Sequence, residues 1–518
     1  MKKSSSFVHS CITVLLILTA TFIFATSFYI SKEFPDQNID EMIFYVVSGL
    51  KGTSSSVLYA AAYRIIVPLL VLFLLWLFPI LRTKNTVNSI ELNIKDKKIR
   101  IHLFSSTFIY KYRAVYAFVI VLFSVSFSYK SLQIGDYINR LSNYSNYIED
   151  HSAKSENVAL HFPDKKRNLI ILYVESLENS MLDQNKGGGW SYPVMPELED
   201  IAEKHINFSD SEKIGGALPI SGTGWTVAGL VATTSGLPLK IPINGNDYTS
   251  STNFMAGAFT LGDILAKEGY HQAFMAGSDF EYGGRKNYYL KHGNFKIYDV
   301  KTAIAEGKIK ENEQVWWGFD DSLLFSWAKE EITSLAHKDQ PFSFSLLTAN
   351  THFTDGYLEK NASSDFDTQY ENVHAYSSKQ ISDFVNWFME QEFYDSTSLV
   401  ILGDHLSMQP NGFFTSRIYE GYSRTIFNTF INPSNEPKRP KNRQFTQLDM
   451  FPTILSSIGV EIEGEHLGLG TNLFSGTKTL VEKAGLSFVD AELAKNSNYY
   501  NLHILQDDYL QLIDQAKE

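Results

Sequence analysis

Two carboxylates and an imidazole follow apolar runs of the sequence. Glu175 closes NLIILYVES (168–176), and Asp404 with His405 closes SLVILGDH (398–405). Continuous apolar runs of this length are typical of buried parallel strands, and ligands of open α/β sheets collect at the carboxyl ends of such strands. A set with mostly oxygen ligands suits Mn or Mg better than a closed structural zinc site. The pattern predicts a divalent-cation site, although each acid taken alone could be a salt-bridged or exposed strand-end residue.

A segment rich in glycine, serine and threonine, GGALPISGTGWTVAGLVATTSGLPL (215–239), contains a candidate nucleophile. Thr226 precedes VAGLVA, a favourable helical start, and the N–H groups at a helix N-terminus attract anions. A free threonine hydroxyl is a poor nucleophile, but a bound dication lowers its pKa and makes it an attacking alkoxide. The alternative is a threonine that only caps the helix or packs against it.

These candidates lie in a region of alternating strand and helix patterns. FSFSLLTANTH (342–352) is a third apolar run, and residues 320–336 and 377–391 have helical patterns. The alternation predicts an α/β domain with a central, mostly parallel sheet. The predicted segments are a linker over 131–165, the α/β domain over 166–480 and a C-terminal tail over 481–518.

Three apolar stretches precede this domain, at residues 10–30, 65–81 and 114–129. A bilayer core needs roughly 20 residues, and flanking Lys and Arg can extend a shorter stretch. The sequence therefore predicts an anchor over residues 1–130 with spans at about 10–30, 62–81 and 112–130. The first stretch is long and has no clean small-x-small site, which favours an uncleaved anchor over a signal peptide.

Charge asymmetry predicts the orientation of the spans. The loop between the second and third spans is basic, whereas the loop between the first and second carries Lys32 and Lys51 against four acids. These residues are Arg82, Lys84, Lys95, Lys97, Lys98, Arg100, Lys111 and Arg113 in the basic loop, and Glu33, Asp36, Asp40 and Glu41 in the acidic one. The positive-inside rule puts the N-terminus and the basic loop in the cytoplasm. Everything after residue 130 is then expected in the periplasm.

The composition excludes two kinds of site. The net charge of -12 argues against binding to nucleic acid, because neutralising phosphates requires clustered Lys and Arg. Cys11, the single cysteine, lies in the first apolar stretch. No disulfide can therefore form within the chain, and a thiolate metal site is excluded.

The ordered motifs NLIILYVESLE, GTGWTVAGLVA, THFTDG, LVILGDH and QLDMFPTIL resemble the alkaline-phosphatase/sulfatase superfamily. Within it, the sequence is similar to the lipoteichoic acid synthase branch, and most similar to the phosphoglycerol transferase I group of Gram-negative bacteria, which modifies osmoregulated periplasmic glucans. The similarity covers about residues 166–475. It also includes LGDIL (261–265), LKHG (290–293), WGFDDS (317–322) and LGLG (467–470).

The resemblance implies roles for individual residues. Glu175, Thr226, Asp404 and His405 match the metal-ligand and nucleophile positions, and Thr226 would form a covalent phospho-threonine intermediate. His352 matches a substrate-binding histidine near the leaving or attacking oxygen, where it could act as a general base.

Three further positions are implied to contact the head group of the substrate. Arg285, in GGRK, matches an arginine that contacts phosphoglycerol, and Asp279 lies near another head-group position. Trp317 either lines the pocket or packs in the core. For Arg285, the alternative is a surface arginine that balances Asp279 or Glu281.

The implied reaction moves sn-glycerol-1-phosphate from phosphatidylglycerol to a periplasmic glucan or another envelope polysaccharide, releases diacylglycerol and uses Mn²⁺ or Mg²⁺. One alternative is a phosphoethanolamine transferase acting on lipid A or another glycan, which the single cysteine disfavours because those relatives usually carry several disulfides. Another is an inactive sulfatase-like membrane sensor, which retention of the site residues disfavours. Sulfatase chemistry is disfavoured because the signature with an oxidisable Cys or Ser is absent, and the context of Ser221 does not match it.

Overall fold

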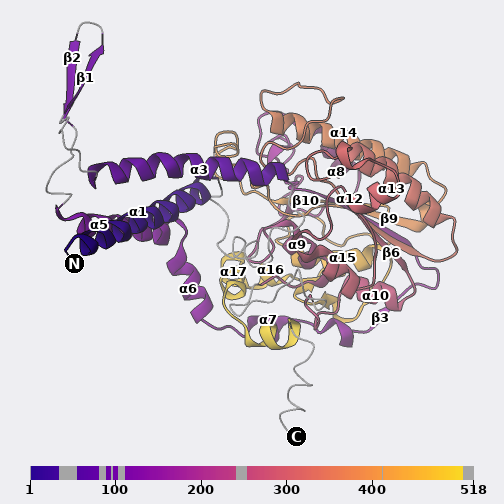
Figure 1. Cartoon of the computed structure of the whole chain (residues 1–518). Coiled ribbons are helices and arrows are strands. Elements are labelled where there is room, and N and C mark those ends of the chain that lie inside the picture. Colours follow the sequence, from indigo (N-terminus) through magenta and orange to yellow (C-terminus); the bar gives the residue numbers. More distant parts are fainter. Residues whose placement is uncertain are drawn as a thin grey trace. The chain divides into compact units, whose positions relative to one another are not determined.

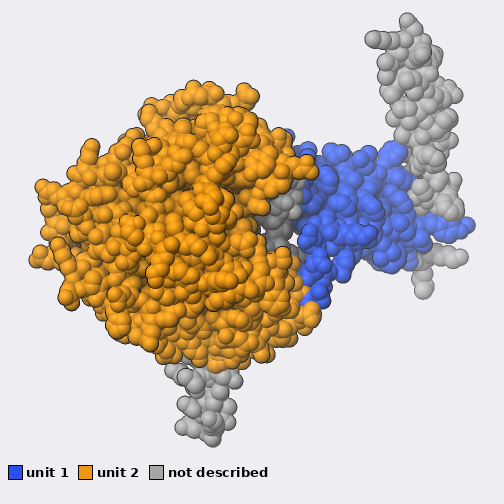
Figure 2. Space-filling view, turned by 180° about the vertical axis from the view of Figure 1, so that it is seen from behind, with its two compact units in different colours: residues 1–35, 55–139 blue, residues 36–54, 140–518 orange. Residues whose placement is uncertain are grey.

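The computed structural model describes residues 2–33, 55–80, 89–94, 97–102, 111–240, 254–410 and 412–505. The chain divides into two compact units: unit 1 contains residues 1–35 and 55–139, and unit 2 contains residues 36–54 and 140–518 (Figure 2). Some residues used in the sequence predictions lie outside the described ranges. They are Asp36, Asp40, Glu41, Lys51, Arg82, Lys84, Lys95 and the tail beyond residue 505.

In unit 1 the three apolar stretches form helices α1 (Lys2–Glu33), α3 (Ser55–Leu77) and α5 (Arg113–Ser131). Segments His9–Lys32, Ala62–Ile80 and Arg113–Ser131 are long and apolar enough to cross a membrane. Helix α1 packs against both other helices, and the Phe24 ring contacts Trp76 of α3 and Phe127 of α5. Strands β1 (Ser89–Ile94) and β2 (Lys97–His102) form an antiparallel hairpin that the sequence pattern did not predict.

Unit 2 is built on a sheet that has seven strands among the described residues, in the order β5-β10-β9-β4-β8-β6-β7. The strands are β4 (Asn168–Val174), β5 (Gly216–Ala217), β6 (His271–Ala276), β7 (Lys296–Tyr298), β8 (Phe342–Leu347), β9 (Thr397–Gly403) and β10 (Ile426–Ile431). Neighbours from β9 to β7 pair in parallel, and β10 is antiparallel to both β9 and β5. The predicted α/β fold with a mostly parallel sheet is confirmed.

Helices cover both faces of the sheet. Figure 1 shows α8, α13 and α14 on one side and α9, α10 and α15 on the other. Their bounds are Pro196–Lys204 (α8), Thr226–Ser235 (α9), Leu261–Lys267 (α10), Asp321–Ala336 (α13), Gln369–Met389 (α14) and Met450–Ser457 (α15). Smaller helices are α6 (Ile134–Ser142), α7 (Tyr147–His151), α11 (Arg285–Lys291), α12 (Val300–Ala305), α16 (Leu480–Ala484) and α17 (Leu486–Ala494).

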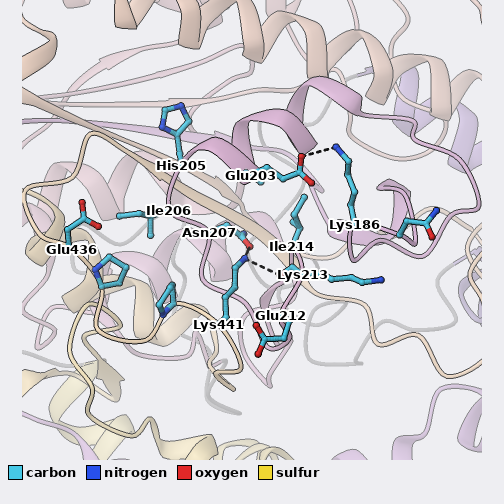
Figure 3. A pocket seen from close by; sticks show the side chains of 14 residues that line it. Lys186, Glu203, His205, Ile206, Asn207, Glu212, Lys213, Ile214, Glu436 and Lys441 are labelled. Atoms are coloured by element: carbon cyan, nitrogen blue, oxygen red, sulfur yellow. Dashed lines mark hydrogen bonds and ion pairs between the residues drawn. The ribbon is translucent and has the colours of Figure 1, made fainter.

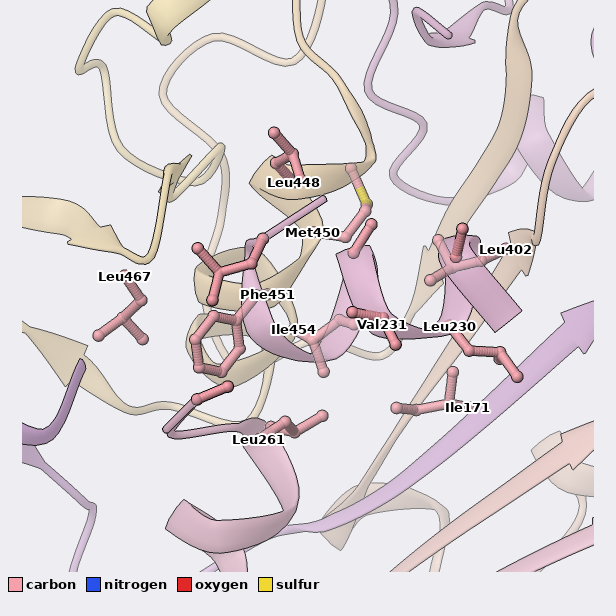
Figure 4. Close-up of a cluster of buried hydrophobic side chains, with 14 of the residues drawn as sticks. Ile171, Leu230, Val231, Leu261, Leu402, Leu448, Met450, Phe451, Ile454 and Leu467 are labelled. Carbon is pink, nitrogen blue, oxygen red and sulfur yellow. The ribbon is translucent and has the colours of Figure 1, made fainter. Parts of the chain in front are cut away.

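Strand β4 is buried on both faces because successive side chains of a strand point to opposite sides. Leu169, Ile171 and Tyr173 belong to the core beneath α9 and α15, whereas Ile170 and Leu172 belong to the core beneath α13 and α14. In Figure 4, Ile171 lies among side chains from α9 and α15. The continuous apolar run in the sequence is thus explained by two cores that share one strand.

The segments on either side of the predicted domain also pack into unit 2. Tyr147 and Ile148 of α7 and Val489 and Leu493 of α17 are buried in its core. Strand β3 (Leu160–His161) pairs with β11 (Glu461–Ile462). The polar composition of residues 131–165 predicted a linker, but the few apolar side chains of its second half are enough to fix that half to the domain.

The strand register brings four loops to one edge of the sheet. Val174 of β4 pairs with Gly403 of β9, and Tyr173 pairs with Leu347 of β8. Leu347 in turn pairs with Ala276 of β6. The loops that contain Glu175, Asp404, His352 and Asp279 therefore all begin at the carboxyl edge of the parallel strands.

Candidate metal centre and active site

Four of the predicted site residues converge at this edge. The Thr226 hydroxyl donates to Glu175 Oε2 at 3.1 Å and lies 3.4 Å from His405 Nε2. His405 Nε2 lies 3.2 Å from Glu175 Oε1 and 3.4 Å from Asp404 Oδ2. The ligand atoms of Glu175, Asp404 and His405 lie within 4.8 Å of one another, and all three residues are buried. One small cation could contact all of them.

Tight turns hold these ligands in place. Ser176 has a left-handed φ of 58° directly after Glu175. Its N–H donates to Asp404 Oδ1 at 2.7 Å, and its hydroxyl donates to Glu175 Oε1 at 2.8 Å. Helix α9 approaches so closely that a Cβ on Gly229 would lie 1.9 Å from the Asp404 carbonyl oxygen. Glycine at position 229 therefore allows the helix that carries Thr226 to reach the metal ligands.

The donor set fits a divalent cation. Asp404 Oδ2 is buried and has no hydrogen-bond partner among the described residues, although an unpartnered buried carboxylate oxygen is costly. His405 Nδ1 lies 2.8 Å from the Leu406 carbonyl and can donate to it. This bond directs Nε2 toward the carboxylates, as in many metal-binding histidines.

The pKa shifts of the cluster also favour a bound cation. Burial alone would raise the pKa of Glu175, but the His405 and His352 imidazoles hold it below its ordinary value. Burial and the adjacent Glu175 raise the pKa of Asp404 well above its ordinary value. Burial would lower the pKa of His405, but Asp404 and Glu175 raise it to about 10. The two acids thus favour a positive charge among them, and a bound dication would supply it.

The surroundings of Thr226 rule out the capping alternative. Thr226 is the first residue of α9, the N-cap is Trp225, and no side chain forms a cap hydrogen bond there. The Thr226 hydroxyl instead faces Glu175 and His405. A phosphate oxygen at this position would meet the N-terminal N–H groups of the ten-residue helix.

His352 and Trp317 form a wall beside the cluster. The centroids of these two rings lie 4.7 Å apart, and the centroid of the Trp317 ring lies 5.3 Å from that of the Tyr282 ring. His352 Nδ1 lies 2.5 Å from the Phe353 carbonyl, which leaves Nε2 for other contacts. Burial lowers the pKa of His352, while the nearby Glu175 charge opposes this. Trp317 is 8% exposed and belongs to neither large core.

Arg285 is buried, so the alternative of a surface arginine is wrong. It is 3% exposed, and it donates to Ser278 Oγ at 2.9 Å and to the Asp279 carbonyl at 2.7 Å. Gly283 and Gly284 before it have φ of 62° and 75°, a conformation that costs glycine little. The positive charge of Arg285 contributes to lowering the pKa of His352, after the larger effect of burial.

The Asp279 carboxylate makes different contacts from those of the cluster. Its Oδ1 accepts from the Glu281 N–H, and its Oδ2 lies 3.0 Å from Lys301 Nζ. Lys301 also pairs with Glu281 at 3.1 Å. The structure therefore brings Glu175, Thr226, Asp404 and His405 together with His352 beside them, whereas the Asp279 side chain faces a lysine.

Sequence reasoning missed several residues that support the site. Thr348 Oγ1 accepts from the Glu175 N–H at 3.0 Å, and the Thr351 hydroxyl donates to the Glu175 carbonyl at 2.6 Å. Gln447 donates to the Asp404 carbonyl. Thr351 and Gln447 had a signal, because they begin the THFTDG and QLDMFPTIL motifs. Ser221, whose sequence context did not match a sulfatase nucleophile, donates to Asp490 instead.

A separate pocket of about 540 Å³ contains none of the predicted site residues (Figure 3). Its lysines are engaged within the protein. Lys186 pairs with Glu203 at 2.9 Å, and Lys441 donates to Asn207 Oδ1 at 2.9 Å.

Comparisons of the sequence with known proteins identify similar proteins. The profile of the sulfatase family matches residues 167–460. Phosphoglycerol transferase I of Escherichia coli O127:H6 and that of Salmonella choleraesuis are each 27% identical over 338 residues, covering 63% of this chain and 41% of the relative. The chain thus spans less than half the length of these curated relatives.

Two solved structures are also similar. The lipoteichoic acid synthase LtaP from Listeria monocytogenes is 17% identical, covering 64% of this chain and 82% of that chain with a TM-score of 0.49. The Streptococcus pyogenes phosphoglycerol transferase GacH, in complex with sn-glycerol-1-phosphate, is 17% identical, covering 73% of this chain and 94% of that chain with a TM-score of 0.43.

Proposed function

We propose that this chain, which belongs to the sulfatase family, is a metal-dependent phosphoglycerol transferase that acts through Thr226. The donor is phosphatidylglycerol, the acceptor is a periplasmic glycan, and diacylglycerol is released. The observation that carries the proposal is the approach of the Thr226 hydroxyl to Glu175 Oε2 and His405 Nε2. Beside them lies Asp404 Oδ2, which has no hydrogen-bond partner among the described residues.

Glu175, Thr226, Asp404 and His405 would hold the cation, for which we propose Mn²⁺ or Mg²⁺ because oxygen ligands predominate. When bound, the cation would lower the pKa of the Thr226 hydroxyl and balance charge on the phosphate oxygens. A hydroxyl nucleophile that needs no prior oxidation favours phosphoryl transfer over sulfate-ester hydrolysis in this member of the family.

In the first step, Thr226 Oγ1 attacks the phosphorus of the lipid, and the bond from phosphorus to the diacylglycerol oxygen breaks. The Thr226 proton departs along its hydrogen bond to Glu175. The leaving oxygen takes a proton from Nε2 of the protonated His352 ring, whose Nδ1 donates to the Phe353 carbonyl. The product is glycerophosphoryl-Thr226 and free diacylglycerol.

In the second step, an acceptor hydroxyl attacks the same phosphorus, and His352 Nε2 takes its proton. The bond from phosphorus to Thr226 breaks, and the proton that Glu175 accepted in the first step returns to Thr226 Oγ1. Burial lowers the pKa of His352, which favours release of its proton in the first step and leaves the neutral form that a general base requires in the second. The two steps use His352 first as acid and then as base.

Arg285 supports a phosphodiester substrate. Hydrogen bonds to Ser278 and to the Asp279 carbonyl fix its guanidinium. Its positive charge helps to lower the pKa of His352. A positive charge at this place would attract the phosphate and repel the ammonium of phosphatidylethanolamine. Trp317 and Tyr282 would enclose the glycerol part.

The location of the substrate fits a membrane anchor. We propose that residues 1–130 cross the cytoplasmic membrane three times and that the α/β domain lies in the periplasm, where it meets a donor that never leaves the bilayer. The three candidate membrane helices support the anchor.

The test uses the full chain in lipid nanodiscs. Nanodiscs with head-group-labelled phosphatidylglycerol should release diacylglycerol, and the wild-type protein should gain one glycerophosphoryl group in intact-protein mass spectrometry. Cells fed the same labelled lipid should show which glycan becomes labelled. Faster turnover of phosphatidylethanolamine than of phosphatidylglycerol would instead assign a phosphoethanolamine transferase.

A further inference from the structure

An ion pair whose carboxylate is fully buried lies next to the proposed metal ligands. Glu178 is fully buried three residues after Glu175, and Arg424 lies between β9 and β10. Arg424 Nε donates to Glu178 Oε1 at 2.9 Å, and Nη2 donates to Oε2. This two-point contact fixes the orientation of both side chains, which a single charge contact would not do.

The pair also holds the loop after β9. Arg424 Nη2 donates to the Ser407 carbonyl at 2.6 Å, and the Ser407 N–H donates to Glu178 Oε2 at 2.8 Å. Ser407 follows His405 by two residues. The loop that carries Asp404 and His405 is thereby tied at both backbone groups of Ser407 to the loop that carries Glu175.

Tyr370 of α14 connects the third loop. Its hydroxyl lies 2.6 Å from Ser407 Oγ and donates to the Thr351 carbonyl at 3.1 Å. Thr351 directly precedes His352, and its own hydroxyl donates to the Glu175 carbonyl. The contacts therefore close a ring that runs from Glu178 through Arg424, Ser407, Tyr370 and Thr351 back to the Glu175 loop.

We propose that Glu178, Arg424 and Tyr370 are positioning residues whose hydrogen-bond ring sets the distances between Glu175, the Asp404–His405 pair and His352. This inference rests on the proposed function, because it assigns the purpose of the ring to the metal centre. The ring residues touch neither the cation nor the substrate. They act through the backbone of the three loops.

Physical reasoning favours this role over simple stabilisation. Burying the Glu178 carboxylate in this ion pair adds little net stability compared with apolar packing, because its desolvation offsets its attraction to Arg424, which is 19% exposed. The ring instead ties loops from three different strands, and partners outside the first coordination shell typically change metal affinity or activity by 10–100-fold. A displacement of one loop would move one ligand relative to the others.

The test compares matched variants of the full chain in nanodiscs. Tyr370→Phe removes only the hydroxyl of the ring. Its control is Tyr500→Phe, because Tyr500 is equally buried and its hydroxyl also contacts backbone groups, the Pro238 carbonyl at 2.7 Å and the Lys240 N–H at 3.2 Å. Arg424→Gln is paired with Arg443→Gln, since Arg443 is buried, pairs with Glu482 at 3.3 Å and binds backbone carbonyls.

Three quantities are measured: the Mn²⁺ dissociation constant, stability in urea and amide hydrogen exchange. We expect Tyr370→Phe and Arg424→Gln to raise the Mn²⁺ dissociation constant about 10-fold or more. The control variants should lose as much stability in urea as the ring variants, while their Mn²⁺ dissociation constants stay within about twofold of wild type. Arg424→Lys should give an intermediate Mn²⁺ dissociation constant, because lysine keeps the positive charge but cannot make the two-point contact of the guanidinium with Glu178. Exchange should quicken in all three loops, 176–180, 348–352 and 404–409.

The outcomes separate this inference from the proposed function. Unchanged Mn²⁺ affinity together with unchanged exchange in the ring variants would overturn the inference. A wild-type protein that binds neither Mn²⁺ nor Mg²⁺ would overturn the proposed metal site, and hydrogen exchange would still decide the ring. If the wild-type protein binds neither ion, faster amide hydrogen exchange in all three loops of the ring variants still supports the ring. Faster exchange that is confined to the loop of the mutated residue refutes it.

Discussion

Replacing Thr226 with alanine should separate catalysis from folding. The mutation removes one hydrogen bond to a buried carboxylate, which costs about 1–3 kcal/mol. Glu175 keeps its bond from Ser176 and its contact with His405, so the lower end applies. Alanine regains about 0.5 kcal/mol of helix propensity. We therefore expect Thr226→Ala to lose at most about 1 kcal/mol of stability.

Activity should fall far more than stability. Loss of a covalent nucleophile lowers turnover by at least about 10³-fold, which corresponds to about 4 kcal/mol at the transition state. Diacylglycerol release from labelled phosphatidylglycerol measures the rate, and intact mass measures the adduct. The control is Thr233→Ala, since Thr233 is buried in the same helix. Among the described residues, its hydroxyl contacts the Gly229 and Leu230 carbonyls and the Tyr173 hydroxyl.

Two outcomes of the Thr226→Ala experiment decide the assignment, and Thr226→Ser adds a second check. Loss of both release and adduct in Thr226→Ala, with Thr233→Ala near wild type, supports the assignment. Thr226→Ser should keep part of the activity, because it keeps the hydroxyl. A folded Thr226→Ala protein with more than about a tenth of wild-type release would refute the reasoning, because no hydroxyl would then be needed.

Further predictions test the metal, the head group and the topology. Chelation should abolish diacylglycerol release, and Mn²⁺ or Mg²⁺ should restore it; full activity in a preparation that elemental analysis shows to be metal-free would contradict the metal site. Arg285→Ala should lower turnover of phosphatidylglycerol about 10-fold or more without unfolding the domain, because a charge-assisted contact to phosphate is lost, and an unchanged rate would remove Arg285 from the substrate site. A reporter that is active only outside the cytoplasm should be active when fused after residue 160, whereas activity of a cytoplasmic reporter at that junction would reverse the proposed orientation.

The motifs LGDIL and LKHG show how a sequence signal can mark structure and not chemistry. Asp263 of the first motif lies 2.8 Å from Nδ1 of His292 in the second, and His292 Nε2 lies 2.9 Å from the Phe254 carbonyl. Asp263 also completes a capping box with Thr260 at the start of α10. The Asp–His pair is therefore used to join α10 to its surroundings, away from the strand-end cluster.

The sequence alone predicted the parts of the site that depend on local pattern. The apolar runs that end in Glu175 and in Asp404–His405 predicted parallel strands, because a strand buried on both faces needs apolar residues at every position. The glycine-rich stretch before VAGLVA predicted the helix that begins at Thr226. The role of Arg285 came from resemblance, and its burial could not be read from GGRK, because burial depends on elements far along the chain.

Only the tertiary structure decided how these pieces meet. The register of β4 with β8 and β9 sets which loops lie side by side, and register depends on pairing between segments more than 170 residues apart. The same holds for the hydrogen-bond ring of Glu178, Arg424 and Tyr370. These residues come from the loop after β4, the loop before β10 and helix α14. Periodicity reports the neighbours of a residue along its own helix or strand, whereas such contacts arise when different elements pack together.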